Sequence, residues 1–224
     1  MLANFTEFKH DLVDIEFKLT QVNTEEGRYY IKEGVEDSPK YPSVTSVLSK
    51  RSEASIKRWR ERVGEAEADR ISQFASERGT LIHEMIENHI MGREQPNVMP
   101  QHFETFRRLR DIADEYIDNI RGVELQMASD HLRVAGTVDL VAEYNGRLSI
   151  IDWKTAKKPK QEKWIHNYFM QESAYAVMFE ENTGIPVDQL VTCITCDTGD
   201  SQVFIQKRDD WIDKFIKERN EYFL

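Results

Sequence analysis

One stretch decides the fold of this chain: residues 135–155, AGTVDLVAEYNGRLSIIDWKT. Two runs of apolar and β-branched residues flank the pair Asn145-Gly146, which is the strongest short-range signal of a β-hairpin. If these two residues form a type I′ turn, counting outward pairs Val141 with Ile150 on a face that continues into the core. The sequence therefore predicts two antiparallel strands in a fixed register.

The same register brings two carboxylates together. It places Asp139 opposite Asp152, with Cβ atoms roughly 5 Å apart, where the two negative charges repel each other. Lys154 shares a face with Asp152 and supplies part of the compensating charge. A divalent cation with oxygen ligands would compensate both carboxylates better. Two interpretations are open at this point: a metal site, or a hairpin whose polar ends reach water.

The order of the polar residues resembles the signature of the PD-(D/E)xK nuclease superfamily, in particular its RecB-type exonuclease branch. Four motifs occur in the order of that branch: Gly79-Thr80-x-x-His83, Gly136-x-x-Asp139, Asp152-x-Lys154 and Gln171-x-x-x-Tyr175. The ordered set is far more specific than any single motif. One departure is that Val138, not proline, precedes the first acid.

Two longer strings narrow the resemblance. Residues 152–160, DWKTAKKPK, are most similar to the mitochondrial genome maintenance exonucleases and their bacteriophage relatives. Residues 41–45, YPSVT, extend the likeness upstream. The resemblance implies an α/β fold with a restriction-endonuclease-like core, in which helices flank a central mixed sheet. We expect residues 1–64 to form an N-terminal hairpin and helical elaboration, and residues 65–224 to form the nuclease core of a single compact domain.

The resemblance also implies a metal site. The catalytic residues would be Asp139, Asp152 and Lys154; one or two Mg²⁺ or Mn²⁺ ions would be held by His83, Asp139, Asp152 and the carbonyl of Trp153. A histidine ligand favours manganese over magnesium. From the residues alone, a single histidine on a helix is more often structural. Glu87, one turn after His83, could be a ligand, could orient the histidine, or could bind nothing.

Several polar segments are candidates for contacting nucleic acid. The resemblance implies that Gln171 and Tyr175 of the fourth motif hold the nucleic-acid backbone near the scissile phosphate. A lysine run over residues 157–163 would guide phosphates. Ser43 or Thr45 would cap a short helix, and the free backbone amides at that helix start could also hold a phosphate. Each segment has a structural alternative as a solvated or capping face. The expected contacts are Gln171, Tyr175, Lys158, Lys160, Thr155, Ser43, Thr45 and Arg58, the last beside Trp59 on a basic helix.

Composition sets limits on these expectations. Forty acidic and thirty basic residues give a formal net charge of −10, which argues against non-specific coating of nucleic acid but permits a local basic channel. No apolar run approaches the roughly 20 residues of a membrane span, so we expect no membrane contact. The N-terminus has neither a secretory nor a transit character, which makes the cytoplasm the default compartment.

The two cysteines form a single C-x-x-C motif at Cys193 and Cys196. An iron–sulfur cluster of the kind found in some RecB-type nucleases needs four thiolates, so we expect none here. The apolar setting of the motif predicts a buried strand with the two thiols on opposite faces.

Hydrophobic periodicity predicts the remaining elements. The expected elements are a hairpin over 15–21 and 28–31, a short helix through 48, a second helix opened by Ser52, helices over 65–91, 101–121 and 162–181, strands over 123–128, from 189 and over 202–206, and a helix from 209. Ile82, Met85, Ile86 and Ile90 would form the buried stripe of the third helix.

The function predicted from the sequence is a metal-dependent exonuclease that hydrolyses single-stranded DNA in replication, recombination or repair. Replication or recombination proteins are the partners that such an enzyme implies, and the oligomeric state is open. One alternative is a structure-specific endonuclease of the same fold. A second alternative, from another class, is a non-catalytic nucleic-acid-binding module.

Overall fold

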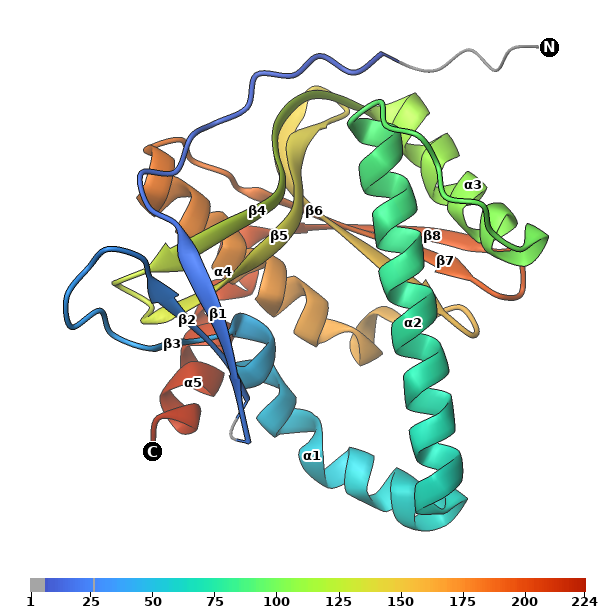
Figure 1. Ribbon diagram of the computed structural model, residues 1–224, viewed down its shortest axis with the longest axis horizontal. Coiled ribbons are helices and arrows are strands. Elements are labelled where there is room, and N and C mark those ends of the chain that lie inside the picture. Colours follow the sequence, from blue (N-terminus) through green and yellow to red (C-terminus); the bar gives the residue numbers. More distant parts are fainter. Residues whose placement is uncertain (1–6, 26) are drawn as a thin grey trace.

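The computed structural model describes residues 7–25 and 27–224 (Figure 1). Its centre is a five-stranded sheet in the order β4-β5-β6-β7-β8. The strands are β4 (Ile117–Ser129), β5 (Val134–Tyr144), β6 (Arg147–Ala156), β7 (Gln189–Cys196) and β8 (Ser201–Lys207). All neighbours are antiparallel except β6 and β7, which are parallel because α4 connects them. This mixed sheet confirms the predicted fold class.

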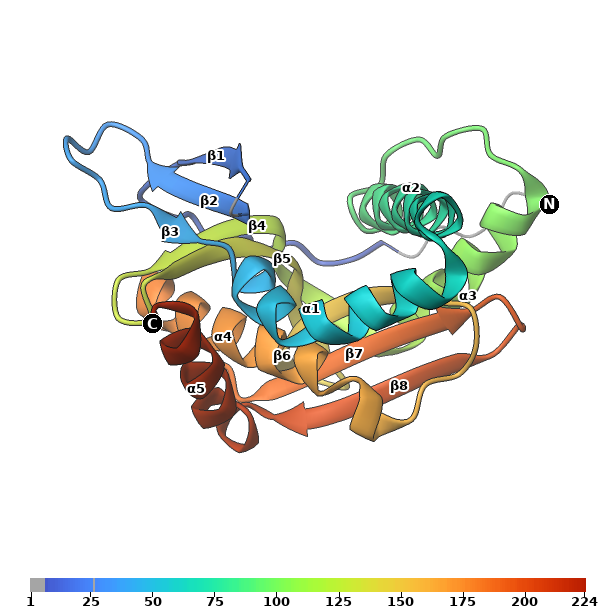
Figure 2. The same ribbon diagram turned by 90° about the horizontal axis from the view of Figure 1, so that it is seen from below.

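Helices cover both faces of the sheet. Two of them, α4 (His166–Thr183) and α5 (Ile212–Tyr222), pack with Val141, Ile150 and other strand residues in one buried cluster. Two more, α2 (Glu65–Ile90) and α3 (Pro100–Tyr116), pack against the opposite face, where the strands contribute Leu140 and Ile151. Alternate residues of one strand thus serve two cores, as the period of two requires. Figure 2 shows these layers from a second direction.

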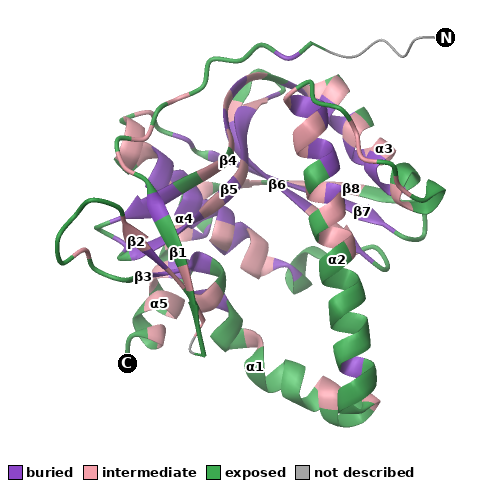
Figure 3. Cartoon of the chain, in the orientation of Figure 1, coloured by how far each residue is buried: buried purple, intermediate pink, exposed green. Residues whose placement is uncertain are grey.

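The N-terminal part adds a small sheet and one long helix. Strands β1 (Leu19–Thr24), β2 (Gly27–Lys32) and β3 (Tyr41–Pro42) form a small sheet. The predicted hairpin is present, but its first strand begins at Leu19 rather than at residue 15. Helix α1 (Val44–Val63) follows and meets α2 at Gly64, whose φ of 88° ends one helix and precedes the other. Figure 3 shows that both helices are largely exposed near this junction.

Four helix boundaries differ from the sequence prediction. Helix α5 begins at Ile212, after the 3₁₀ turn η2 (Arg208–Asp210), rather than at Asp209. Helix α1 is continuous from Val44 to Val63, so the prediction of a second helix that begins at Ser52 is wrong. Nothing around Ser52 breaks the helix. Its hydroxyl accepts a hydrogen bond from the side-chain amide of Asn167 (3.3 Å). Helix α3 ends at Tyr116 rather than near residue 121, because Ile117 and Asp118 already pair with β5. Helix α4 begins at His166, after a 3₁₀ turn η1 (Glu162–Trp164).

Other predictions are confirmed. The stripe formed by Ile82, Met85, Ile86 and Ile90 is buried. Cys193 and Cys196 lie in strand β7 and belong to the two different clusters, so their thiols do lie on opposite faces. Among the described residues, no helix is both long and apolar enough to cross a membrane.

Candidate metal centre

The hairpin of β5 and β6 has the register that the sequence predicts. Tyr144 pairs with Arg147 and Val141 with Ile150, and both turn residues have positive φ (53° and 73°), as a type I′ turn requires. The last paired residues are Leu140 and Ile151. Asp139 and Asp152 therefore lie one step beyond the ladder.

Beyond the ladder the two strands are joined through a side chain. The backbone N–H of Trp153 donates a hydrogen bond to Oδ2 of Asp139 (2.9 Å). This bond fixes the carboxylate of Asp139 at the point where the strands part. The opening created there is where the candidate site lies.

Asp152 lies beneath this opening and is only 1% exposed. One carboxylate oxygen forms an ion pair with Lys154, and the other accepts a hydrogen bond from Nε2 of Gln171 (3.0 Å). Burial raises the pKa of Asp152 to about 6. Burial alone would lower the pKa of Lys154, but Asp152 and Asp139 raise it above its ordinary value. Lys154 is therefore an ammonium group at neutral pH.

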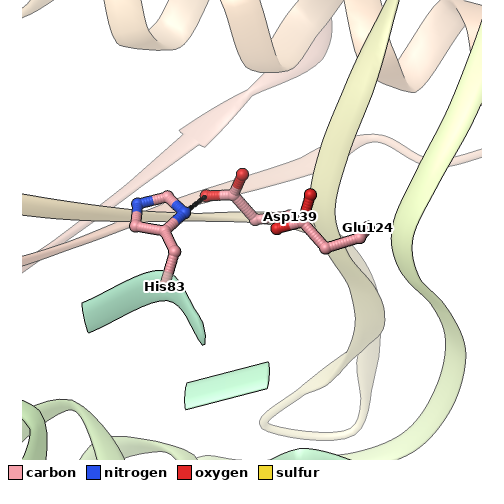
Figure 4. Close-up of side chains that lie close together, drawn as sticks. All are labelled: His83, Glu124 and Asp139. Atoms are coloured by element: carbon pink, nitrogen blue, oxygen red, sulfur yellow. Dashed lines mark ion pairs between the residues drawn. The ribbon is translucent and has the colours of Figure 1, made fainter. Parts of the chain in front are cut away.

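His83, Glu124 and Asp139 bring their ligand atoms within 4.8 Å of one another (Figure 4). Nδ1 of His83 lies 3.5 Å from Oδ2 of Asp139, and its Nε2 lies 2.7 Å from the carbonyl oxygen of Trp153. If Nε2 carries the proton, it donates to that carbonyl and leaves the Nδ1 lone pair facing the two carboxylates. At metal sites, a carbonyl or carboxylate commonly accepts a hydrogen bond from the other ring nitrogen of a ligand histidine and orients the ring in this way.

Glu124 was missed by the sequence analysis. It lies in β4, the neighbour of β5, between Val123 and Leu125, which pair with Leu140 and Val138. Burial, followed by the charge of Asp139, raises the pKa of Glu124 to about 7. The strand prediction over 123–128 was the only available signal, because an acid opposite Asp139 becomes visible only once β4 and β5 are paired.

The donor set fits a divalent metal ion. The carboxylates of Glu124 and Asp139 converge with the imidazole of His83, and the buried carboxylate of Asp152 is paired with Lys154. Lys154 supplies only one positive charge to these three acids, which leaves an excess of negative charge for a cation to offset. Carboxylate oxygens suit Mg²⁺ and Mn²⁺, and the imidazole favours Mn²⁺. Asp152 is tied to Lys154 and Gln171, so the ligand atoms that lie closest together are those of His83, Glu124 and Asp139.

A cavity of about 250 Å³ opens on this cluster. Seven of the predicted site residues line it: Ser43, Thr45, His83, Asp139, Lys154, Gln171 and Tyr175. Arg28 and Glu124 line it too and were not predicted. Ser43 caps α1, since its hydroxyl accepts a hydrogen bond from the N–H of Ser46 (2.9 Å). The positive end of α1 therefore lies at the cavity wall, where an anion is stabilised.

The other predicted contacts lie outside this cavity. Arg58 is exposed on α1, and Thr155 accepts a hydrogen bond from Arg78 (3.3 Å). Lys158 and Lys160 lie in the loop that follows β6 and line a separate hollow. Glu87, left open by the sequence, forms an ion pair with Arg93 (2.6 Å).

A further acid, Glu172, is buried behind the site and accepts a hydrogen bond from the hydroxyl of Thr192. Burial raises its pKa well above the ordinary value for a glutamic acid. Because Glu172 follows Gln171 in α4, its hydrogen bond with Thr192 helps to fix the start of the fourth motif. The motif pattern alone did not reveal it.

A family model matches a large part of this chain. The model of the PD-(D/E)XK nuclease superfamily matches residues 94–220, more than half of the chain and including Glu124 and the motifs from Asp139 to Tyr175. His83 lies outside the matched range. A crystal structure of a Eubacterium rectale protein provisionally assigned as an exonuclease covers 65% of this chain and 68% of its own, with 12% identity and a TM-score of 0.41.

Curated relatives agree with that match. Mitochondrial genome maintenance exonuclease 1 of Mus musculus is 30% identical over 129 residues, and its Homo sapiens counterpart is 29% identical over the same length. Each alignment covers 53% of this chain but only 38% of the relative. These matches confirm the family predicted from the order of the motifs: the chain belongs to the PD-(D/E)XK nuclease superfamily.

Proposed function

We propose that this protein is a metal-dependent DNA exonuclease that hydrolyses phosphodiester bonds and prefers single-stranded DNA with a free end. The observation that carries the proposal is the convergence of His83, Glu124 and Asp139 within 4.8 Å, beside the ammonium group of Lys154. The names of the curated relatives support exonuclease action. Replication, recombination or repair is the setting in which such an activity is used.

The residues divide the chemistry between them. His83, Glu124 and Asp139, assisted by Asp152, would hold one or two Mg²⁺ or Mn²⁺ ions, which supply the Lewis-acid chemistry that activates water and offsets negative charge on the phosphate. Lys154 donates hydrogen bonds to the attacking water or to a phosphate oxygen. Its raised pKa keeps it protonated, so it does not act as the general base.

The walls of the cavity position the substrate. The free amides at the start of α1, with Ser43 and Thr45, bind a phosphate, and Arg28 adds a positive charge on the same wall. Gln171 holds Asp152 in place through its hydrogen bond. The small volume of the cavity and the acidic surface of the chain favour one strand over a duplex.

The direct test uses labelled single-stranded DNA in a linear form and in a covalently closed circular form. We expect the linear strand to be degraded with Mn²⁺ or Mg²⁺, with no loss in EDTA and no cutting of the circle. Cutting of the circle would show that the protein is an endonuclease of the same fold and not an exonuclease. Absence of cleavage with either metal, in folded protein that still binds DNA, would leave a non-catalytic binding module.

A further inference from the structure

An exposed tryptophan lies in the segment between β6 and α4. Trp164 is 62% exposed, whereas Trp153 and Trp211 are 2% and 5% exposed. Tryptophan is highly buried on average, so a ring that remains mostly in water loses a large apolar contribution to stability. Neither the buried clusters nor the metal site uses this ring.

The same segment is strongly basic. Residues 157–164, which we name the basic loop, contain four lysines and one acid, Glu162, in a chain whose net charge is −10. Within the described part of the chain, none of the four lysines forms an ion pair. The ammonium group of Lys163 lies 5.7 Å from the ring centroid of Trp164. Positive charge and an aromatic face therefore occur side by side.

The backbone of the basic loop is held in place. The N–H of Lys160 donates to Oε1 of Gln202 (2.7 Å), and Nε2 of Gln202 donates to the carbonyl of Lys160 (3.0 Å). The N–H of Trp164 donates to the carbonyl of Gln161 (2.9 Å). A hollow of about 560 Å³ is lined by Lys157, Lys158, Pro159, Lys160, Gln161 and Trp164. The loop is thus ordered while its charged and aromatic side chains remain accessible.

The basic loop connects the two elements that build the metal site. Strand β6 brings Asp152 and Lys154 to the site and then enters the loop (Figure 2). Helix α4 returns from the loop: the ring centroid of Tyr168 lies 5.1 Å from Nζ of Lys154, and Gln171 binds Asp152. Trp164 lies two residues before the start of α4 at His166, and Gln171 follows His166 by five residues, roughly 7.5 Å at the helical rise of 1.5 Å per residue. A strand held at the site can therefore reach the loop.

We propose that the basic loop is a binding site for single-stranded nucleic acid, in which the indole of Trp164 stacks on one base and the lysines bind the neighbouring phosphates. The inference rests on the proposed function, because it takes the substrate to be a nucleic acid strand. Stacking on an aromatic ring accepts any base, since every base has a π-face. The contact would hold the strand without selecting its sequence.

The test is binding of a labelled single-stranded oligonucleotide in EDTA, followed by fluorescence anisotropy. We expect Trp164→Ala to weaken binding by about 5- to 50-fold, in line with the loss of one stacked base, and Trp164→Phe to retain most of the affinity. Phe74→Ala is the matched control: that ring is 55% exposed on α2, outside the basic loop, and its loss should leave affinity unchanged. Lys157→Ala combined with Lys158→Ala should reduce the salt dependence of binding.

A second oligonucleotide separates stacking from charge. On a strand of the same length made of abasic deoxyribose phosphates, wild-type protein and Trp164→Ala should bind equally. If Trp164→Ala lost the same affinity for both strands, or lost none for the normal strand, the stacking contact would be overturned. The exposed ring of Trp164 would then be assigned to contact with a protein partner. If wild-type protein binds through Trp164 yet cleaves nothing with any metal, the proposed function fails while this contact stands.

Discussion

A Cβ atom on Gly136 would lie 2.8 Å from Cε1 and 3.0 Å from the hydroxyl of Tyr175. The ring of Tyr175 is only 3% exposed and is packed in the main cluster, so it cannot yield without moving its neighbours. The glycine of the second motif thus allows α4 to approach β5 closely. This explains why glycine and tyrosine occur together in the pattern that the sequence shows.

Gly136→Ala should therefore displace Tyr175 and disturb the site. We expect a loss of about 1–3 kcal/mol in the free energy of unfolding, as for overpacking of a core, together with reduced cleavage. Denaturant unfolding and a cleavage assay measure the two effects.

Gly79→Ala is the matched control. A Cβ there meets no atom within 4 Å, and Gly79 lies inside α2, so alanine should raise stability by up to about 1 kcal/mol. Equal stability of Gly136→Ala and wild type would refute the close-packing argument.

Gln171→Ala should lower cleavage by about 10- to 100-fold, the usual cost of losing a group that orients a ligand. The reason is that Asp152 then loses the hydrogen bond from Nε2 and can turn away from the metal. Gln73→Ala, on the exposed face of α2, should have no effect. Wild-type rates for Gln171→Ala would show that the hydrogen bond does not position Asp152.

Glu124→Gln should weaken Mn²⁺ binding by roughly tenfold or more, because it removes one charged ligand from the cluster. Isothermal titration with Mn²⁺ measures this without any substrate. Glu87→Gln is the control on the adjoining helix: Glu87 pairs with Arg93 and should not contribute. If Glu87→Gln weakened Mn²⁺ binding and Glu124→Gln did not, the acidic ligand would be Glu87 of α2 rather than Glu124 of β4.

Metal binding should strengthen as pH rises from about 5 to 8. The pKa values of Asp152 and Glu124 are raised to about 6 and about 7, so protons compete with the metal below these values. Without metal, in EDTA, the pH dependence of stability has the opposite sign: these two acids make the protein less stable as pH rises. Both folded-state pKa values exceed the ordinary ones, so these groups favour the folded state at low pH and lose that contribution as pH rises through 6 and 7.

Thermal unfolding in EDTA and in Mn²⁺ across this pH range tests both signs. The melting temperature should rise with Mn²⁺ more at pH 8 than at pH 5. In EDTA, Glu124→Gln should show a weaker decline towards high pH than wild type. A metal-induced shift that does not change with pH would contradict the assignment of these acids.

Local signals made part of this structure predictable. The Asn145-Gly146 turn fixed the register by counting, and the apolar stripe of Ile82 to Ile90 fixed the buried face of α2. A helix cap was predicted at Ser43 or Thr45 by residue type and position, and Ser43 is the one that caps α1. These features depend on neighbours in the sequence, for which periodicity and turn chemistry are informative.

The features that escaped prediction depend on tertiary pairing. Glu124 becomes a candidate ligand only because β4 lies beside β5, and α3 ends at Tyr116 because the next residues join the sheet. The exposure of Trp164 follows from where α4 begins, which no local pattern indicated. The division of the chain at residue 64 and the roles of the site residues stay predictions.

The central claim is that one site built on β4, β5 and β6 hydrolyses phosphodiester bonds with a metal ion. Asp152→Asn tests it most directly, because the amide oxygen can still accept from Gln171 while the charge is lost. The measurement is the rate of degradation of linear single-stranded DNA in Mn²⁺, with circular dichroism to verify folding. We predict that Asp152→Asn is folded and inactive; a folded variant that degrades DNA at the wild-type rate would contradict the claim.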